Sequence, residues 1–144
     1  MDNISIIKIM VVVGVLVLCA YGDIREKKVS VYMILAGIGG TIILNILGKD
    51  ISLVNALLGA ALGIVLIVVS KLTKGALGTG DAMLTVMIGL SIGLFNTMLA
   101  LFYALLITSV VSVILLLLKR VKKQTAMPFV PFMLLGYLGV IFSW

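Results

Sequence analysis

Long apolar runs, separated by short charged segments, dominate this chain. The runs are Ile4–Tyr21, Val29–Leu47, Ile51–Ser70, Ala82–Leu118 and Met127–Trp144. A bilayer core of about 30 Å is crossed by about 20 helical residues, so four of these runs each predict one transmembrane helix. The run Ala82–Leu118 is too long for one crossing at about 1.5 Å per residue. We expect it to break near Gly93–Asn96, because glycine and asparagine favour a turn. The pattern therefore predicts an all-α polytopic membrane protein with six transmembrane helices.

Composition supports a membrane protein and narrows its class. The chain has 144 residues, of which 63% are hydrophobic and 11% charged; soluble domains average about 25% charged residues. The length allows one transmembrane domain, residues 1–144, and no stretch is polar enough to form a separate soluble domain. There is no histidine and one cysteine, Cys19. A Cys/His zinc site and an intrachain disulfide are therefore excluded.

The positions of the basic residues predict the orientation of the helices. Nine of the eleven lie in the segments after the first, third and fifth predicted helices, namely Arg25, Lys27, Lys28, Lys71, Lys74, Lys119, Arg120, Lys122 and Lys123. The other two are Lys49 and Lys8, and we expect Lys8 to snorkel out of the first helix. The positive-inside rule makes the first side cytoplasmic and places both termini outside. The same distribution argues against a nucleic-acid partner.

Two of the five acidic residues are predicted at the same membrane face. Asp23 closes the first helix and Asp81 opens the fourth, and both ends are on the cytoplasmic side. A charged side chain at membrane depth is costly and therefore suggests a functional site. Each has a structural interpretation when taken alone: Asp81 as a helix N-cap, and Asp23 as an ion-pair partner of Arg25 or Lys27. Taken together on one face, they favour a functional pair.

Paired aspartates of this kind suit hydrolysis by acid/base catalysis. One ionised carboxylate takes a proton from water, while the other, protonated, hydrogen-bonds the carbonyl of the scissile bond. Like charges in close proximity push two pKa values apart, so the pair shares one proton. Gly78 and Gly80, just before Asp81, permit positive φ angles and close approach of a substrate strand. No metal ion or organic cofactor is expected.

Three segments together resemble the type IV prepilin peptidases, the A24 family of membrane aspartyl peptidases. Asp23–Val29 is similar to the family's first motif, an Asp followed by a basic run and an aliphatic residue. Gly78-Thr79-Gly80-Asp81 matches the G-x-G-D motif. Pro128–Phe132 resembles the Pro-Phe-x-Pro-aromatic stretch that opens the last helix of the family. The resemblance covers nearly the whole chain, and the conjunction is more specific than any one segment.

The resemblance implies an activity and its residues. It implies that Asp23 and Asp81 are catalytic and that the chain cleaves the leader peptide from pilin-like precursors, prepilins or preflagellins, at the cytoplasmic face of the cell membrane. Glu26 is a further candidate, as a contact to the basic leader, although pairing with a neighbouring Lys or Arg explains it equally well. With one cysteine, the chain resembles the short, peptidase-only form similar to Tad/Flp-pilus and archaeal preflagellin peptidases. No N-methyltransferase or zinc domain is expected.

The chain departs from the family pattern at a few positions, and two other functions remain open. Ser30 and Val31 stand where the family usually has Pro-Asn, and Met83 stands where a lysine often follows the second Asp. The rival functions are a small proton-coupled transporter and a non-catalytic subunit of a pilus or secretion assembly. Polar side chains within the apolar runs predict interhelical hydrogen bonds; they are Asn45, Asn55, Ser70 and Thr85. The small residues of Gly59–Gly63 predict close helix packing.

Overall fold

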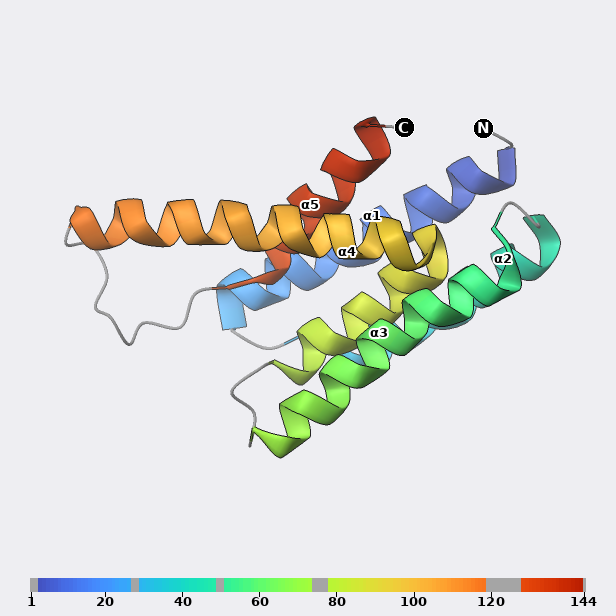
Figure 1. Cartoon of the computed structure of the whole chain (residues 1–144), viewed down its shortest axis with the longest axis horizontal. Coiled ribbons are helices and arrows are strands. Elements are labelled where there is room, and N and C mark those ends of the chain that lie inside the picture. Colours follow the sequence, from blue (N-terminus) through green and yellow to red (C-terminus); the bar gives the residue numbers. More distant parts are fainter. Residues whose placement is uncertain (1–2, 27–28, 49–50, 74–77, 119–127, 144) are drawn as a thin grey trace.

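The computed structural model describes residues 3–26, 29–48, 51–73, 78–118 and 128–143, and within these ranges every regular element is an α-helix. In chain order they are α1 (Asn3–Glu26), α2 (Val31–Gly48), α3 (Leu53–Leu72), α4 (Thr79–Leu117) and α5 (Val130–Phe142) (Figure 1). Helices α1 to α4 are long and apolar enough to cross a membrane, whereas α5 is a shorter apolar helix. The prediction of an all-α membrane protein is therefore confirmed, but that of six membrane-spanning helices is not.

Helix α4 is broken at Gly93, within the predicted segment Gly93–Asn96. Gly93 has φ 78° and ψ 178°, which is not helical. Figure 1 shows the ribbon of α4 changing direction sharply between its first part, beside α3, and its second part, which runs away from α3. The amide side chain of Asn55 accepts a hydrogen bond from Leu94 N at 3.0 Å. This bond satisfies one of the backbone donors that the start of a helix leaves without a partner.

The first part of α4 packs against α3 at backbone distance. A Cβ atom on Gly59 would collide with the backbone carbonyl of Gly89, and one on Gly89 would collide with that of Gly59. One turn away, a Cβ on Gly63 would collide with the backbone of Val86. The close packing predicted for Gly59–Gly63 is confirmed. Since only glycine allows this approach, the contact fixes how α4 lies along α3.

Lys8 does not snorkel out of α1, contrary to the sequence prediction. Its side chain is 3% exposed, and its Nζ donates to Asn45 Oδ1 at 3.0 Å. Asn45 Nδ2 in turn donates to Leu90 O at 2.6 Å. Leu90 lies just before the break in α4, where backbone carbonyls lose their helical donors and the helix end favours a positive charge. The three residues therefore connect α1, α2 and α4, and Asn45 has the interhelical role predicted for it.

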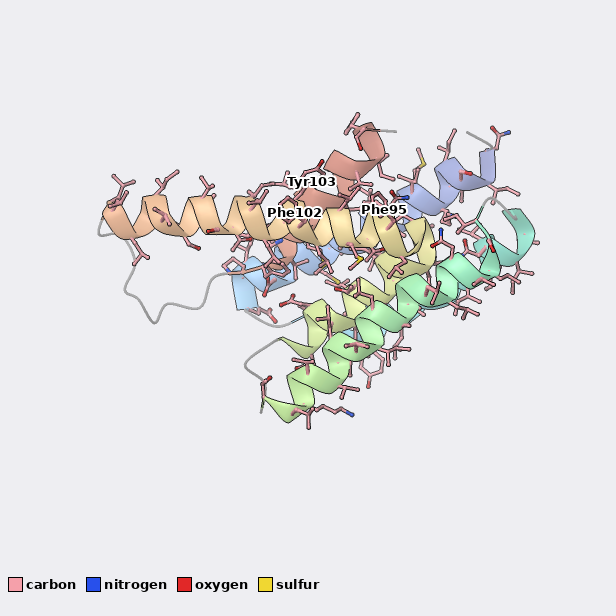
Figure 2. The ribbon with its side chains drawn as sticks, viewed as in Figure 1. Phe95, Phe102 and Tyr103 are labelled. Atoms are coloured by element: carbon pink, nitrogen blue, oxygen red, sulfur yellow. The ribbon has the colours of Figure 1, made fainter. Side chains whose placement is uncertain are left out.

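Large apolar side chains cover much of the outer surface. Phe95, Phe102 and Tyr103 lie along the second part of α4 (Figure 2), with exposed fractions of 71%, 55% and 38%. In water such a surface would be an aggregation hazard, but it suits contact with lipid. Other polar side chains turn inward: the hydroxyls of Ser91 and Tyr137 are hydrogen-bonded at 3.1 Å. Thr85 bonds Asp81 O within its own helix rather than between helices.

The main buried core joins α1, α2, α4 and α5. It contains Leu16 and Cys19 of α1, Leu84 and Met87 of α4, and Met133 of α5. The sequence leaves open whether the first helix neighbours the fourth, and the structure shows that the two helices pack together. In Figure 1 the end of α1 and the starts of α2, α4 and α5 lie in the same region, left of the middle, and the second part of α4 extends past them. This arrangement brings the two candidate aspartates to the same region.

Candidate active site

Asp23 lies in the last turn of α1, which continues to Glu26 rather than ending near Tyr21. Its side chain is half-buried, and Asp23 Oδ2 accepts a hydrogen bond from Val130 N at 3.2 Å. Val130 is the first residue of α5, so Asp23 satisfies a backbone donor at the start of a helix that lies far along the chain. The positive end of the α5 dipole favours a negative charge at this position. No described cation forms an ion pair with Asp23, so pairing with Arg25 is not observed.

Asp81 lies in the first turn of α4 and faces the same region as Asp23. Its side chain is half-buried, and the charge of Asp23 acts on it. No described residue donates a hydrogen bond to its carboxyl group. The residue before the helix is Gly78, so Asp81 is not the N-cap that its sequence position suggests. One aspartate is therefore anchored by a backbone N–H, while the other is free of described donors.

The segment Pro128–Phe132 presents a backbone N–H group to Asp23. Pro131 occupies the first turn of α5 and has no N–H to satisfy. The N–H groups of Phe132 and Met133 both bond to Phe129 O, at 3.0 and 3.1 Å. Among these first residues Val130 is left to donate elsewhere, and its partner is Asp23. The third segment of the resemblance, Pro128–Phe132, thus contacts Asp23 directly through its backbone.

Gly78 and Gly80 leave space for neighbouring side chains, and they do not serve to allow unusual backbone angles. Gly78 is extended, with φ −60° and ψ 123°, and among the described glycines only Gly93 has a positive φ. A Cβ on Gly78 would lie 2.7 Å from Asp81 Oδ2. A Cβ on Gly80 would lie 3.0 Å from Val29 Cβ. The first glycine therefore leaves room for the Asp81 carboxyl group, and the second lets α4 begin against the segment that follows α1.

Glu26 lies one turn beyond Asp23, at the exposed end of α1. No described residue forms an ion pair or hydrogen bond with it. The neighbouring cation, Arg25, instead donates to Tyr21 Oη at 3.1 Å. Lys27 and Lys28 lie outside the described residues, as do Lys49, Lys74 and the basic cluster of residues 119–123, so the predicted charge distribution is described only at Lys8, Arg25 and Lys71. Pairing of Glu26 with Arg25 is not observed.

Among the described residues, the positions that depart from the family pattern form no hydrogen bond or ion pair with Asp23 or Asp81. Met83, where a lysine often stands, is half-buried and packs against the core. Ser30 precedes α2, and its carbonyl accepts a hydrogen bond from Ile34 N at 3.3 Å. Val31 is the first residue of α2. Among the described residues, no group of three His, Cys, Asp or Glu side chains could hold a metal ion.

The backbone of Val130 is the part of the site that sequence reasoning missed. An N–H group has no signature in residue type, and Val130 reads as one more aliphatic residue of the last helix. The available signal was the pair of prolines, Pro128 and Pro131, which restrict the backbone around it. They predict a fixed start for the helix, but not which distant acceptor it meets.

Comparison with known proteins agrees with the motifs. The model of the type IV leader peptidase family matches residues 10–117. This range contains both aspartates and the G-x-G-D segment, whereas Pro128–Phe132 lies outside it. Searches of curated proteins and of solved structures gave no match. Because the matched residues make up well over half of the sequence and include both motifs that carry acids, the chain belongs to the type IV leader peptidase family.

Proposed function

We propose that this protein is an intramembrane aspartyl endopeptidase in which Asp23 and Asp81 form the catalytic pair. One observation carries the proposal. Two acidic residues from α1 and α4 lie close enough for the charge of one to act on the other, within a chain of a leader peptidase family. Two half-buried carboxyl groups with no counter-ion among the described residues are costly to maintain. A catalytic role accounts for that cost.

In the proposed reaction one aspartate is ionised and the other protonated. The ionised carboxylate takes a proton from water, and the hydroxide attacks the peptide carbonyl carbon, while the protonated carboxyl donates to the carbonyl oxygen. When the tetrahedral intermediate collapses, the C–N bond breaks and the amine leaves with the proton that the first aspartate had taken. The second aspartate takes back a proton from one hydroxyl of the intermediate as the carbonyl re-forms, so that both carboxyl groups return to their starting states. The chemistry needs no metal or organic cofactor. The two roles belong to the pair, because interacting carboxyl groups titrate together.

The proposed substrates are pilin-like precursors, cleaved after a short leader at the cytoplasmic face of the cell membrane. The family supports leader peptides as the substrate class. The excess of Lys and Arg in the segments beside the aspartates supports the cytoplasmic side. Methyl transfer to the new N-terminus is not part of the proposal, and methylation of the product by the purified chain would contradict this.

The test is a cleavage assay in membranes with a panel of pilin-like precursors. The wild type, Asp23→Asn and Asp81→Asn would be compared, and loss of the leader read by mass spectrometry. We expect cleavage by the wild type alone. Cleavage that survives either substitution would refute the catalytic pair.

Neither rival function is favoured by a feature of the site. A proton-coupled transporter usually carries its acids near the middle of the membrane, whereas Asp23 and Asp81 lie within a turn of their helix ends. A non-catalytic assembly subunit would tolerate Asp81→Asn. Restoration of pilus assembly by Asp81→Asn in cells that lack the chain would therefore favour the subunit.

A further inference from the structure

A cavity opens on the outer surface of the molecule between the last turns of α1 and the start of α2. Its volume is ≈ 340 Å³, near the lower end of the range of about 300–1,000 Å³ typical of ligand sites. Its inner part is formed by Cys19, Gly22 and Val29, which are buried or half-buried. The other lining residues are exposed, so the cavity is open to the surroundings of the protein. Neither Asp23 nor Asp81 lines it.

The lining changes from apolar to polar along the two helices. On α1, Arg25 lies about two turns after Leu18, or about 10 Å further along the axis at about 1.5 Å per residue. Helix α2 runs back along α1 (Figure 1); Ser30 stands just before it, and Met33 lies within its first turn. The side chains of Leu18 and Met33 are both exposed. Both helices therefore place apolar side chains on the inner side of the membrane boundary and polar groups beyond it.

The cavity lies at the depth where lipid hydrocarbon meets the headgroups. A headgroup layer is roughly 5–7 Å thick on each side of a hydrocarbon core of about 30 Å, so the distance from Leu18 to Arg25 crosses the boundary. Tyr21 lies between them, exposed, and its hydroxyl accepts a hydrogen bond from Arg25. Tyrosine is enriched at this interface. A ligand that is apolar at one end and polar at the other fits the lining, and a phospholipid has this form at this depth.

The polar end of the cavity carries one positive and one negative side chain. Arg25 and Glu26 are adjacent on α1 and point about 100° apart, so they do not face each other. Arg25 uses one N–H on a neutral hydroxyl and keeps its charge and its other donors. No described residue pairs with Glu26. A ligand with one charge of each sign satisfies both side chains, whereas a ligand with a single charge is repelled by one of them.

We propose that this cavity binds one molecule of phosphatidylethanolamine, with its phosphate at Arg25 and its ammonium group at Glu26. The first carbons of an acyl chain then lie against Leu18 and Met33. The Ser30 hydroxyl and the start of α2 support the phosphate side, because the first N–H groups of a helix have no intrahelical partner and favour an anion. The inference does not depend on the proposed peptidase activity.

The chemistry of the rim separates this lipid from other common phospholipids. Phosphatidylglycerol has a phosphate for Arg25 but no cation for Glu26. Phosphatidylcholine has a cation, but its quaternary nitrogen has no N–H to donate to a carboxylate. The primary ammonium of ethanolamine supplies both the charge and the donors, and charged hydrogen bonds of this kind are the stronger ones.

Photo-crosslinking of the full chain in nanodiscs tests the site. The bilayer would be phosphatidylcholine with a small fraction of phosphatidylethanolamine that carries a diazirine near the top of one acyl chain. Matched probes would carry the same acyl chain on glycerol and choline headgroups. We expect the ethanolamine probe to crosslink within residues 18–33, as mapped by mass spectrometry, with roughly two- to fivefold higher yield than either matched probe, the difference that one exposed ion pair makes. Equal yields would mean annular lipid only, and a preference for the glycerol probe would mean an anionic lipid at Arg25 alone; either result would overturn the proposal.

Two charge substitutions test the two halves of the headgroup. Glu26→Gln keeps the size of the side chain and removes its charge, so the preference for ethanolamine over glycerol should disappear. Arg25→Gln should lower the yield of all three probes, because each has a phosphate. A preference for ethanolamine that survives Glu26→Gln would overturn the proposal.

A pair of tryptophan substitutions tests the location. Leu18→Trp places a large ring in the cavity, whereas Val17→Trp places the same ring at the adjacent position, which does not line it. The original side chains are 56% and 48% exposed, so the fold should tolerate either ring. Leu18→Trp should abolish the headgroup preference and Val17→Trp should retain it. The same result from both variants would overturn the site.

The alternative occupant is a basic side chain of a peptide, which the charge of Arg25 disfavours. A soluble lysine-bearing peptide should therefore leave the crosslink of the ethanolamine probe unchanged. Glycerophosphoethanolamine, which has the headgroup without acyl chains, should leave it unchanged as well, because the apolar half of the cavity contributes to binding. Displacement of the probe by either soluble compound would overturn the lipid site.

Discussion

The carboxylate of Asp23 accepts a hydrogen bond from the backbone N–H of Val130, a residue 107 positions further along the chain. The bond joins the end of α1 to the start of α5, so Asp23 has a structural role independent of any chemistry. That role is an alternative explanation for the residue. An experiment on Asp23 must therefore separate the loss of a helix contact from the loss of an acid or base.

Asp23→Asn and Asp23→Ala separate the two roles. Asparagine keeps an oxygen that can accept from Val130 N but cannot exchange a proton with water. We expect Asp23→Asn to lower kcat by roughly 10²- to 10⁴-fold while the thermal midpoint in detergent changes little. Asp23→Ala should lose activity and also about 1 kcal/mol of stability, because the N–H group at the start of α5 loses its acceptor. An active asparagine variant would leave Asp23 with the structural role alone.

Gly78→Ala tests whether the glycine serves the Asp81 carboxyl group. The added Cβ would lie 2.7 Å from Asp81 Oδ2, so the carboxyl must rotate away. Such a rotation costs the fold little stability but moves a proposed catalytic group, and we expect kcat/KM to fall roughly tenfold or more. The free energy of unfolding should change by less than about 1 kcal/mol. Gly14→Ala, where a Cβ meets no atom within 4 Å, is the control. Unchanged activity in Gly78→Ala would show that this space is not needed.

The sequence predicts the features that depend on periodicity and charge. The apolar runs predict α1 to α3 within a few residues. The break in α4 falls in the predicted segment because its glycine and asparagine are turn-forming residues. The placement of Asp23 and Asp81 at the same end follows from counting helices between them, and the packing of α1 against α4 agrees with it.

Features that depend on which side chains meet could not be predicted in this way. Lys8 reads as a snorkelling residue at the start of an apolar run, and only the position of Asn45 on α2 shows that it is buried. Gly78 and Gly80 read as sites of unusual backbone angles, but their neighbours, Asp81 and Val29, show that they provide space. Helix α4 begins earlier than the apolar run because Thr79 and Gly80 are not apolar yet are helical.

Gly93→Ala should disturb the break in α4. Alanine is strained at φ 78°, and its Cβ would lie 2.5 Å from Asn55 Nδ2, the side chain that caps Leu94. We expect a loss of roughly 1–3 kcal/mol in the free energy of unfolding. Asn55→Ala should cost a similar amount, because Leu94 N loses its acceptor. The measurement is reversible unfolding in detergent micelles, and equal stability of Gly93→Ala and the wild type would contradict the strain.

Lys8 donates to Asn45, and Asn45 donates to Leu90. These two hydrogen bonds predict that substitutions of Lys8 and Asn45 have unequal effects on stability. Asn45→Leu removes both the acceptor of Lys8 Nζ and the donor to Leu90 O, and it leaves a positive charge 3% exposed with one partner fewer. We expect a loss of roughly 3–5 kcal/mol. Lys8→Met keeps the apolar stem and removes the charge together with its need for partners, so the loss should be only about 1–2 kcal/mol.

The double variant distinguishes a coupled pair from two independent contacts. If burial of the lysine charge is what makes Asn45→Leu costly, then Lys8→Met removes the cause of the cost. The double variant should then lose less free energy of unfolding than the two single variants lose in sum. A coupling of roughly 1–3 kcal/mol is expected in a double-mutant cycle measured by unfolding in micelles. Additive losses would mean that Asn45 stabilises the fold through Leu90 alone. In that case α1 would be positioned by its apolar contacts, and the alignment of Asp23 with Asp81 would not depend on Lys8.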